Sequence, residues 1–255
     1  MSLHVETIGH GPDLLLLHGW GMHGGVWAPV VTELAASFRL HIVDLPGLGH
    51  SATITPYTLE TLATAVAQAA PASTAVCGWS LGGQVALRWA LKQPEQVKKL
   101  VLVGSTPRFV NSDDWQYGVD DGVFRQFAAE VRQDYHGTLS RFLALQAHGG
   151  DAAKETIRQL RKQFFERSEP PPETLQAGLD MLLTTDLRAD LGRITAPALV
   201  LHGDYDQLAP LQAGAWLAQH LPSSHLQTCA GASHAPFLSH PTWFVAAIKE
   251  FLLNG

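Results

Sequence analysis

The chain of 255 residues has few charges, few cysteines and no long apolar run. Charged residues make up 16% of it, against about 25% in an average soluble protein. Two cysteines, Cys77 and Cys229, are too few for a disulfide framework or a four-cysteine zinc site. The apolar run Leu14 to Leu17 is far shorter than the roughly 20 residues that cross a membrane. Apolar residues nevertheless reach 46%, which predicts a globular protein with a large core.

An excess of basic residues is also missing. The sequence has 17 Lys and Arg against 23 Asp and Glu, a net charge of −6, and phosphate binding needs a basic surface. We therefore expect no nucleic-acid partner. Residues 1–6 carry no basic segment followed by an apolar stretch, so we expect a cytoplasmic protein, and at this size a monomer. The common zinc-protease and phosphate-loop motifs are absent from the sequence, and we expect no metal or cofactor.

Short apolar runs alternate with helical patterns along most of the chain. Strands are predicted at 14–17, 40–43, 75–77, 100–103 and 198–201, with a further strand-like run at 225–228. Helices are predicted at 26–36, 59–70, 82–92, 211–220 and 243–253. Buried strands separated by helices indicate an α/β fold with a mostly parallel sheet flanked by helices. Ligands of such folds bind at the carboxyl ends of the strands.

The region 107–190 breaks this alternation. It contains no strand-like run, only amphipathic helical patterns such as 139–146 and 152–165, interrupted by three prolines at 170–172. We expect this region to form a helical cap inserted into a core made of residues 1–106 and 191–255.

The segment Gly78-Trp79-Ser80-Leu81-Gly82 follows a predicted strand and opens a predicted helix. This is the context of a nucleophile elbow, in which a tight turn presents a serine hydroxyl above the sheet. Glycine is needed on both sides because a Cβ would meet neighbouring backbone. We interpret Ser80 as the nucleophile of a serine hydrolase.

A serine hydroxyl needs a base, and the base needs an orienting acid. In folds with this elbow the order along the chain is Ser, acid, His. His234 lies in a loop of small residues before the last helix, and we predict it to be the base. Asp206 is our candidate for the acid, and Asp204 is the competing candidate, although an Asp there could also cap its own turn.

His18-Gly19-Trp20-Gly21 follows the first predicted strand and indicates an oxyanion loop. Acyl transfer needs two fixed hydrogen-bond donors, and we expect the backbone amides of Trp20 and Leu81 to provide them. His18 is expected to bond loop backbone without a catalytic role. Trp20 and Trp79 either line the acyl pocket or belong to the core.

Positive charge is concentrated in one region of this acidic chain. Residues 137–168 hold six Lys and Arg against three Asp and Glu, a net +3, whereas the remainder carries −9. Lys154, Arg158, Arg161 and Lys162 share roughly one face of a predicted helix. Such a face is either an ordinary solvated surface or a docking site for an acidic macromolecule.

At this point the chain resembles the α/β hydrolases over essentially its whole length, and among them the pimeloyl-[acyl-carrier protein] methyl ester esterase family of biotin synthesis. The resemblance rests on five motifs: Leu17-His18-Gly19-Trp20-Gly21, Val43-Asp44-Leu45-Pro46-Gly47, Gly78-Trp79-Ser80-Leu81-Gly82-Gly83, Arg141-Phe142-Leu143-Ala144-Leu145-Gln146 and Ala232-Ser233-His234-Ala235-Pro236-Phe237. The tryptophan in the oxyanion loop and the Arg141 to Gln146 run distinguish this family from other hydrolases.

The resemblance implies a serine carboxylesterase that acts on a carrier-bound seven-carbon methyl ester and releases methanol. It implies Ser80, Asp206 and His234 as the triad, with oxyanion amides from Trp20 and Leu81. It also implies an acyl channel lined by Phe142, Leu143, Ala144, Leu145 and Gln146. Arg141 and Arg158 match basic residues with which the family grips its acidic carrier. Lys154 stands where the family can have Arg, Arg161 belongs to the same charged face, and Gly137 replaces one further basic position.

Two other functions are compatible with these residues. The chain could be a cap-bearing serine hydrolase of another kind, such as a short-chain carboxylesterase or a carbon–carbon bond hydrolase, with no preference for a carrier. It could also be a hydrolase-derived protein that binds a ligand with negligible turnover.

Overall fold

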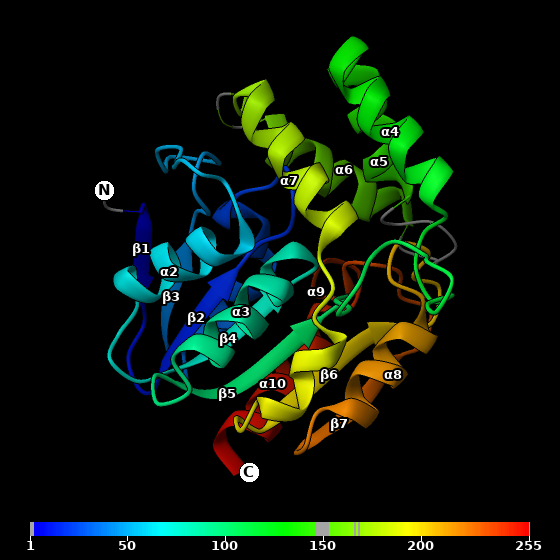
Figure 1. Ribbon diagram of the computed structural model, residues 1–255. Helices are drawn as coiled ribbons and strands as arrows, with labels where there is room; N and C mark the ends of the chain where they lie inside the picture. Colours follow the sequence, from blue (N-terminus) through cyan, green and yellow to red (C-terminus); the bar gives the residue numbers. More distant parts are fainter. Residues whose placement is uncertain (1–2, 146–152, 166, 168, 255) are drawn as a thin grey trace.

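The computed structural model describes residues 3–145, 153–165, 167 and 169–254 (Figure 1). One sheet of seven strands forms its centre, in the order β1-β3-β2-β4-β5-β6-β7. β1 pairs antiparallel with β3, and the other neighbouring strands are parallel. The strands are β1 Val5–Ile8, β2 Asp13–Leu17, β3 Arg39–Val43, β4 Thr74–Trp79, β5 Val97–Val103, β6 Ala198–Gly203 and β7 Ser224–Cys229.

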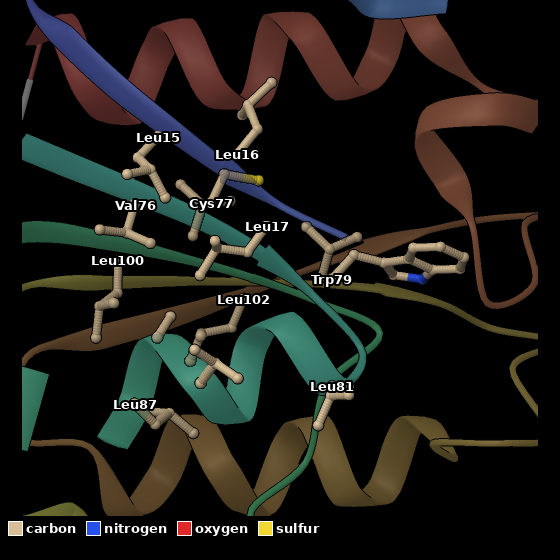
Figure 2. Packing of buried hydrophobic residues seen from close by; sticks show 14 of the residues in the cluster. Leu15, Leu16, Leu17, Val76, Cys77, Trp79, Leu81, Leu87, Leu100 and Leu102 are labelled. Carbon is tan, nitrogen blue, oxygen red and sulfur yellow. The ribbon is translucent and has the colours of Figure 1, made fainter. Parts of the chain in front are cut away.

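Helices cover both faces of the sheet. α1 packs beside α10 and α2 packs beside α3, and Figure 2 shows strands between α3 on one side and α10 on the other. These helices and their short neighbours are η1 Gly24–Trp27, α1 Ala28–Ala35, α2 Leu59–Ala69, α3 Leu81–Lys92, η2 Arg188–Arg193, α8 Leu211–His220, α9 Pro236–Ser239 and α10 Pro241–Asn254. The predicted α/β class is confirmed. Within the described residues, we find no helix with the length and apolar character needed to cross a membrane.

Strand β1 was not among the strands predicted from the sequence. It has four residues and lies at the edge of the sheet, where its first residue, Val5, pairs with Val43 of β3. Its residues are half-buried or exposed rather than uniformly buried, so they do not form the apolar run by which the inner strands were recognised.

The core is centred on the inner strands. Leu14 to Leu17 of β2 are fully buried and pack with Val76 of β4 and Leu100 of β5 (Figure 2). Their side chains alternate between two covered faces, which is why this strand reads as an unbroken apolar run. Each buried leucine contributes about 1.5–3 kcal/mol to the free energy of unfolding. Cys77 lies in the same core, and burial raises the pKa of its thiol, as expected of an unreactive cysteine.

The described residues between β5 and η2 form four helices, and we call them the inserted helices. They are α4 Asp121–Gln133, α5 Tyr135–Leu145, α6 Ala153–Phe165 and α7 Pro172–Thr184. Figure 1 shows them gathered beyond one end of the sheet, the end toward which the arrow of β5 points. Asp120 starts α4 by accepting a hydrogen bond from the amide of Val123, and Pro172 stands at the first position of α7.

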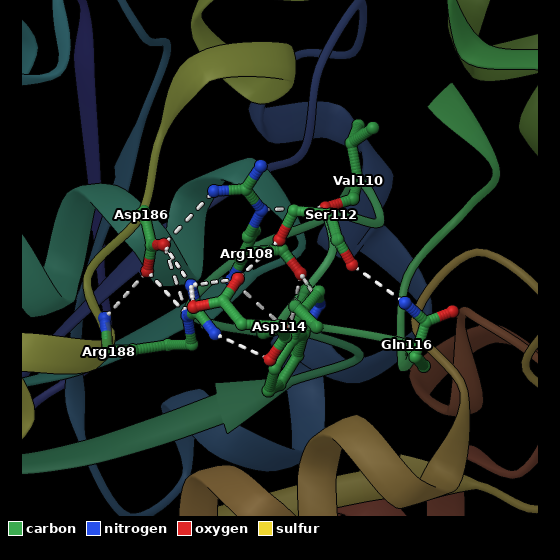
Figure 3. A network of polar contacts seen from close by, with 9 residues as sticks. Arg108, Val110, Ser112, Asp114, Gln116, Asp186 and Arg188 are labelled. Carbon is green, nitrogen blue, oxygen red and sulfur yellow. Dashed lines mark hydrogen bonds and ion pairs between the residues drawn. The ribbon is translucent and has the colours of Figure 1, made fainter. Parts of the chain in front are cut away.

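The two connections of the inserted helices to the core meet side by side. The amide of Leu187 donates to the carbonyl of Pro107 at 3.0 Å. A charged network surrounds this point: Arg108 and Arg188 both donate to Asp186, and Arg188 also donates to Asp114 (Figure 3). This network joins the entry and the exit of the insertion.

We predict that Arg188→Met lowers the free energy of unfolding by about 1–2 kcal/mol, because it leaves Asp186 with one cationic partner fewer in a partly desolvated site. The Arg188 side chain is 18% exposed. Arg193 pairs with Asp190 at 2.9 Å but is 70% exposed, so Arg193→Met is the matched control and should change stability by less than about 0.5 kcal/mol. Urea unfolding followed by tryptophan fluorescence measures both. Equal effects of the two substitutions would contradict the prediction.

Candidate active site

Ser80 lies at the sharp turn between β4 and α3. Its φ of 56° is positive, which no other described residue apart from glycines shares. A positive φ is costly for a residue with a Cβ and persists only where surrounding contacts fix it. Here the amide of Ser80 donates to the carbonyl of Val103 at 2.9 Å, and Ser105 Oγ donates to the carbonyl of Ser80 at 3.0 Å. The turn is therefore held by β5 and the residues that follow it.

Two glycines allow this turn to form. A Cβ on Gly82 would lie 2.5 Å from the carbonyl oxygen of Leu17 and 2.6 Å from that of His18. A Cβ on Gly78 would overlap the carbonyl of Gly82. Helix α3 can thus start close against β2, with Ser80 at its amino end.

His234 and Asp206 come together after the last two strands. His234 Nδ1 lies 2.8 Å from Asp206 Oδ2, and both side chains are buried. The other carboxylate oxygen, Oδ1, accepts hydrogen bonds from the amides of Leu208 and Ala209, both at 2.9 Å. Asp204 is exposed and instead accepts a hydrogen bond from the amide of Gly231 at 2.8 Å. The carboxylate that faces the imidazole is that of Asp206.

This arrangement fixes the protonation of the neutral imidazole. Asp206 Oδ2 can only accept, so the proton of neutral His234 is on Nδ1 and its Nε2 can act as a base. The loop of His234 is tied to the elbow, because the indole nitrogen of Trp79 donates to the backbone carbonyl of His234 at 2.8 Å. Ser80 and His234 both line one cavity.

Residues 18–24 form the loop after β2, which we call the oxyanion loop after its predicted role. His18 is fully buried, and its ring bridges backbone, as predicted: Nδ1 donates to the carbonyl of Gly19 and Nε2 accepts from the amide of Leu45. Burial lowers the pKa of His18 to about 4, so the ring is neutral at neutral pH. Trp20 lies within this loop. Leu81 is the first residue of α3, where a backbone N–H has no partner inside the helix.

The cavity at Ser80 has a volume of about 100 Å³. It lies between the core and the inserted helices α4, α5 and α7. Its polar residues are Ser80 and His234. The other described residues that line it are apolar: Trp20, Phe109, Val119, Val123, Phe124, Phe127, Phe142, Leu179, Leu182 and Leu208. An apolar lining of this kind suits an alkyl group that carries one reactive polar group. The described residues contain no cluster of His, Cys, Asp and Glu that could hold a metal ion.

Comparisons with known proteins identify the family of the chain. A family model described as α/β hydrolase fold matches residues 12–241. The chain is 47% identical over 245 residues to the pimeloyl-[acyl-carrier protein] methyl ester esterase of Nitrosomonas europaea, with 96% of this chain and 97% of the relative covered. The protein of the same name from Aeromonas salmonicida is 44% identical over 254 residues, covering 99% of this chain and 100% of the relative.

The chain belongs to the pimeloyl-[acyl-carrier protein] methyl ester esterase family of α/β hydrolases. Solved structures repeat the fold of this family. A bromoperoxidase from Bacillus anthracis superposes with a TM-score of 0.90 at 25% identity, covering 98% of this chain and 95% of that chain. An esterase from Thermogutta terrifontis superposes with a TM-score of 0.84 at 26% identity, covering 99% and 93%.

Only some of the described residues that were expected to bind substrate line the cavity at Ser80. Phe142 lines the cavity, and so does Trp20, whose indole ring meets that of Phe142 edge to face with centroids 5.4 Å apart. Trp79 is buried in the core beside Phe237. Leu143 is fully buried and Ala144 half-buried, and among the described residues neither lines the cavity. The Leu145 side chain and all of Gln146 lie outside the described residues.

Most of the residues that line the cavity were not predicted from the sequence. Phe124 and Phe127 come from α4, and Leu179 and Leu182 from α7, two helices that were not predicted individually. The spacing of three residues in each pair is a helical signal, but the same pattern is typical of ordinary core packing. His202 was also missed: it is fully buried, and its Nε2 donates to the carbonyl of Ala209, whose amide in turn bonds Asp206.

The basic residues expected to meet a carrier lie on the inserted helices. Lys154, Arg158 and Arg161 are exposed on α6, and Arg158 pairs with Glu155 of its own helix at 2.6 Å. Arg141 is exposed on α5 and pairs with Glu130 at 2.8 Å. Exposed pairs of this kind contribute little to stability, so these arginines can exchange partners at small cost.

We predict that Gly104→Ala lowers kcat at least tenfold, because a Cβ at this position would displace the His234–Asp206 pair, and small displacements of catalytic groups cost about 10–100-fold. The added Cβ would lie 3.1 Å from His234 Nδ1 and 3.2 Å from Asp206 Oδ2, on a backbone with φ of +48°. Gly192→Ala is the control, since its Cβ would meet nothing within 4 Å. Steady-state kinetics on a p-nitrophenyl ester measures both variants. Unchanged kcat in a folded Gly104→Ala protein would show that this close packing is dispensable.

Proposed function

We propose that this chain hydrolyses the methyl ester of pimeloyl-[acyl-carrier protein] to pimeloyl-[acyl-carrier protein] and methanol in biotin synthesis. The observation that carries the proposal is the identity of 43–47% with relatives bearing that name, over nearly the full length of both chains. The strained Ser80 and the His234–Asp206 pair, which meet at one apolar cavity, support the chemistry that the name requires.

In the proposed mechanism Ser80 Oγ attacks the carbonyl carbon of the methyl ester while His234 Nε2 takes the hydroxyl proton. Asp206 accepts the Nδ1 hydrogen bond and stabilises the imidazolium. The amides of Trp20 and Leu81 hold the oxyanion of the tetrahedral intermediate. His234 then gives its proton to the departing methoxide, so methanol leaves and an acyl-enzyme remains. Water, activated by His234, attacks that ester and releases the carboxylic acid and Ser80.

The inserted helices act in this proposal as a cap, residues 107–190, on a core of residues 1–106 and 191–255. Their aromatic and aliphatic side chains line the cavity together with Ser80, and this apolar lining suits the methylene groups of the substrate. Phe142 is the proposed contact from the Phe142 to Gln146 segment.

The enzyme acts as a cytoplasmic monomer, with no metal or cofactor and with no nucleic acid or membrane as partner.

Carrier recognition is assigned to Arg141, Lys154, Arg158 and Arg161. Their exposure on α5, which lines the cavity, and on α6, which packs against α5, supports contact with an acidic protein whose acyl arm enters the cavity. The negative charge of the rest of the chain disfavours binding of such a protein elsewhere.

Substitutions of the triad should separate the two candidate carboxylates. Ser80→Ala is expected to lower kcat by on the order of 10⁶-fold, because the reaction loses its nucleophile. Asp206→Asn is expected to lower kcat by on the order of 10⁴-fold, because the imidazole loses its orienting acceptor. Asp204→Asn is the matched control and should keep most activity, since its carboxylate accepts from the amide of Gly231 rather than facing the imidazole. Kinetics on a p-nitrophenyl ester and labelling by a fluorophosphonate provide the measurements. Near-normal turnover by Ser80→Ala would exclude the mechanism, and the reverse order of the two Asp variants would exclude Asp206.

Charge reversal on α6 should separate a carrier-specific esterase from a general one. Arg158→Glu combined with Arg161→Glu is expected to raise KM for a carrier-bound methyl ester about tenfold or more, because two attractive contacts become repulsive. KM for a small p-nitrophenyl ester should stay the same, since neither side chain is among the described residues that line the cavity. Equal changes for the two substrates would refute carrier docking on this face and would favour a short-chain carboxylesterase.

A further inference from the structure

Arg167 connects the inserted helices to the core. It lies between α6 and α7, and its Nη1 donates to Oδ2 of Asp44 in the loop after β3. Exposure of the two side chains is 17% for Arg167 and 1% for Asp44. An ion pair that is this well shielded from water differs from the exposed pairs that Arg141 and Arg158 form on the inserted helices.

Asp44 holds the end of the oxyanion loop. Its Oδ1 accepts a hydrogen bond from the amide of Gly24 at 2.7 Å, and its Oδ2 also accepts from the amide of His50 at 2.9 Å. The next residue, Leu45, donates its amide to His18 Nε2 at 2.9 Å, which fixes the start of the same loop. Both ends of the oxyanion loop are thus attached to the Asp44–Leu45 segment.

The chain just beyond Arg167 also holds the middle of the oxyanion loop. The indole nitrogen of Trp20 donates to the carbonyl of Leu175 in α7 at 2.9 Å. The hydroxyls of Thr53 and Thr174 lie 3.2 Å apart and join α7 to the loop after β3. The inserted segment therefore contacts the indole of Trp20 directly, and it contacts the Gly24 end of the oxyanion loop through Asp44.

We propose that Arg167 is a positioning residue, which makes the geometry of the oxyanion loop depend on docking of the inserted helices. This proposal rests on the proposed function, in which the amide of Trp20 stabilises the oxyanion. When the guanidinium pairs with Asp44, the carboxylate keeps its bonds to Gly24 and His50 and the Trp20 amide stays in place. Without that pairing, the inserted helices and the oxyanion loop both shift from these positions.

The physical basis is the cost of a buried carboxylate. Burial by itself would raise the pKa of Asp44, but neighbouring His18, the amides of His50 and Gly24 and the Arg167 guanidinium outweigh it and keep the pKa below its usual value. Removing the guanidinium leaves a buried anion short of one partner, so the loop moves toward water to solvate it. Oxyanion donors act only when they are fixed in advance, so a small shift reduces kcat.

Arg167→Met tests the proposal on a p-nitrophenyl ester. We expect kcat to fall about tenfold with KM for this small ester unchanged, because a donor that acts in the transition state is displaced. Affinity for a short alkyl trifluoromethyl ketone, which forms a tetrahedral adduct with the serine, should fall by a similar factor. Arg167→Lys restores the charge beside Asp44 and should bring kcat to within about threefold of the starting protein.

Arg125→Met is the matched control. Arg125 also pairs with an aspartate on an inserted helix, at 2.7 Å from Asp121, but its side chain is 61% exposed. It should leave kcat and inhibitor affinity unchanged. Arg167→Gln, whose amide can still donate one hydrogen bond to Asp44, is the second variant if Arg167→Met does not fold, and its kcat should fall at least threefold.

Three results would overturn the proposal: full kcat in a folded Arg167→Met or Arg167→Gln protein, a loss that Arg125→Met shares, or a rise in KM without a fall in kcat. Each of these can occur while Ser80→Ala remains inactive, so the proposal can fail without the proposed function. Conversely, full activity of Ser80→Ala would remove the proposed mechanism whatever Arg167 does.

Discussion

The strained turn at Ser80 is the constraint on which the site depends. A serine with positive φ is stable only because backbone from β2, β5 and the start of α3 surrounds it at distances that exclude any side chain on Gly78 or Gly82. This packing places the hydroxyl, the first amides of α3 and the oxyanion loop at the same edge of the sheet. The parallel sheet thus supplies rigidity, and the chemistry occupies the loops at its carboxyl edge.

The same edge gathers groups from distant parts of the chain without long loops. His234 and Asp206 follow β7 and β6, and the indole of Trp79, next to Ser80, donates a hydrogen bond to the backbone of His234. The oxyanion loop is held in the same way by buried hydrogen bonds: Asp44 accepts from the amide of Gly24, and the ring of His18 accepts from the amide of Leu45. Buried polar groups with complete sets of partners define these loops more sharply than apolar contacts could.

The sequence predicted structure correctly where a position requires an unusual backbone conformation or where a strand forms a continuous apolar run. The elbow glycines and the leucines of β2 gave such signals, and so the α/β class and the inner strands were predicted correctly. Strand β1 was missed because edge position removes the apolar pattern. The cavity wall was missed because Phe127 and Leu179 read as core residues, and only the packing of α4 and α7 over Ser80 turns them toward a cavity. The Arg167–Asp44 pair joins residues 123 positions apart, a contact that no local pattern encodes.

The paired ends of the insertion also bear on how such enzymes diversify. Pro107 and Leu187 are hydrogen-bonded neighbours, so the chain leaves the core and returns at nearly one point. A segment anchored in this way can gain, lose or exchange helices with little disturbance of the strands beneath it. Substrate choice can then change by replacing this segment, while Ser80 and His234 in the core stay in place. The side chains that bond across the boundary between the inserted helices and the core then limit the exchange, because a new segment must provide matching partners for the core residues around the site.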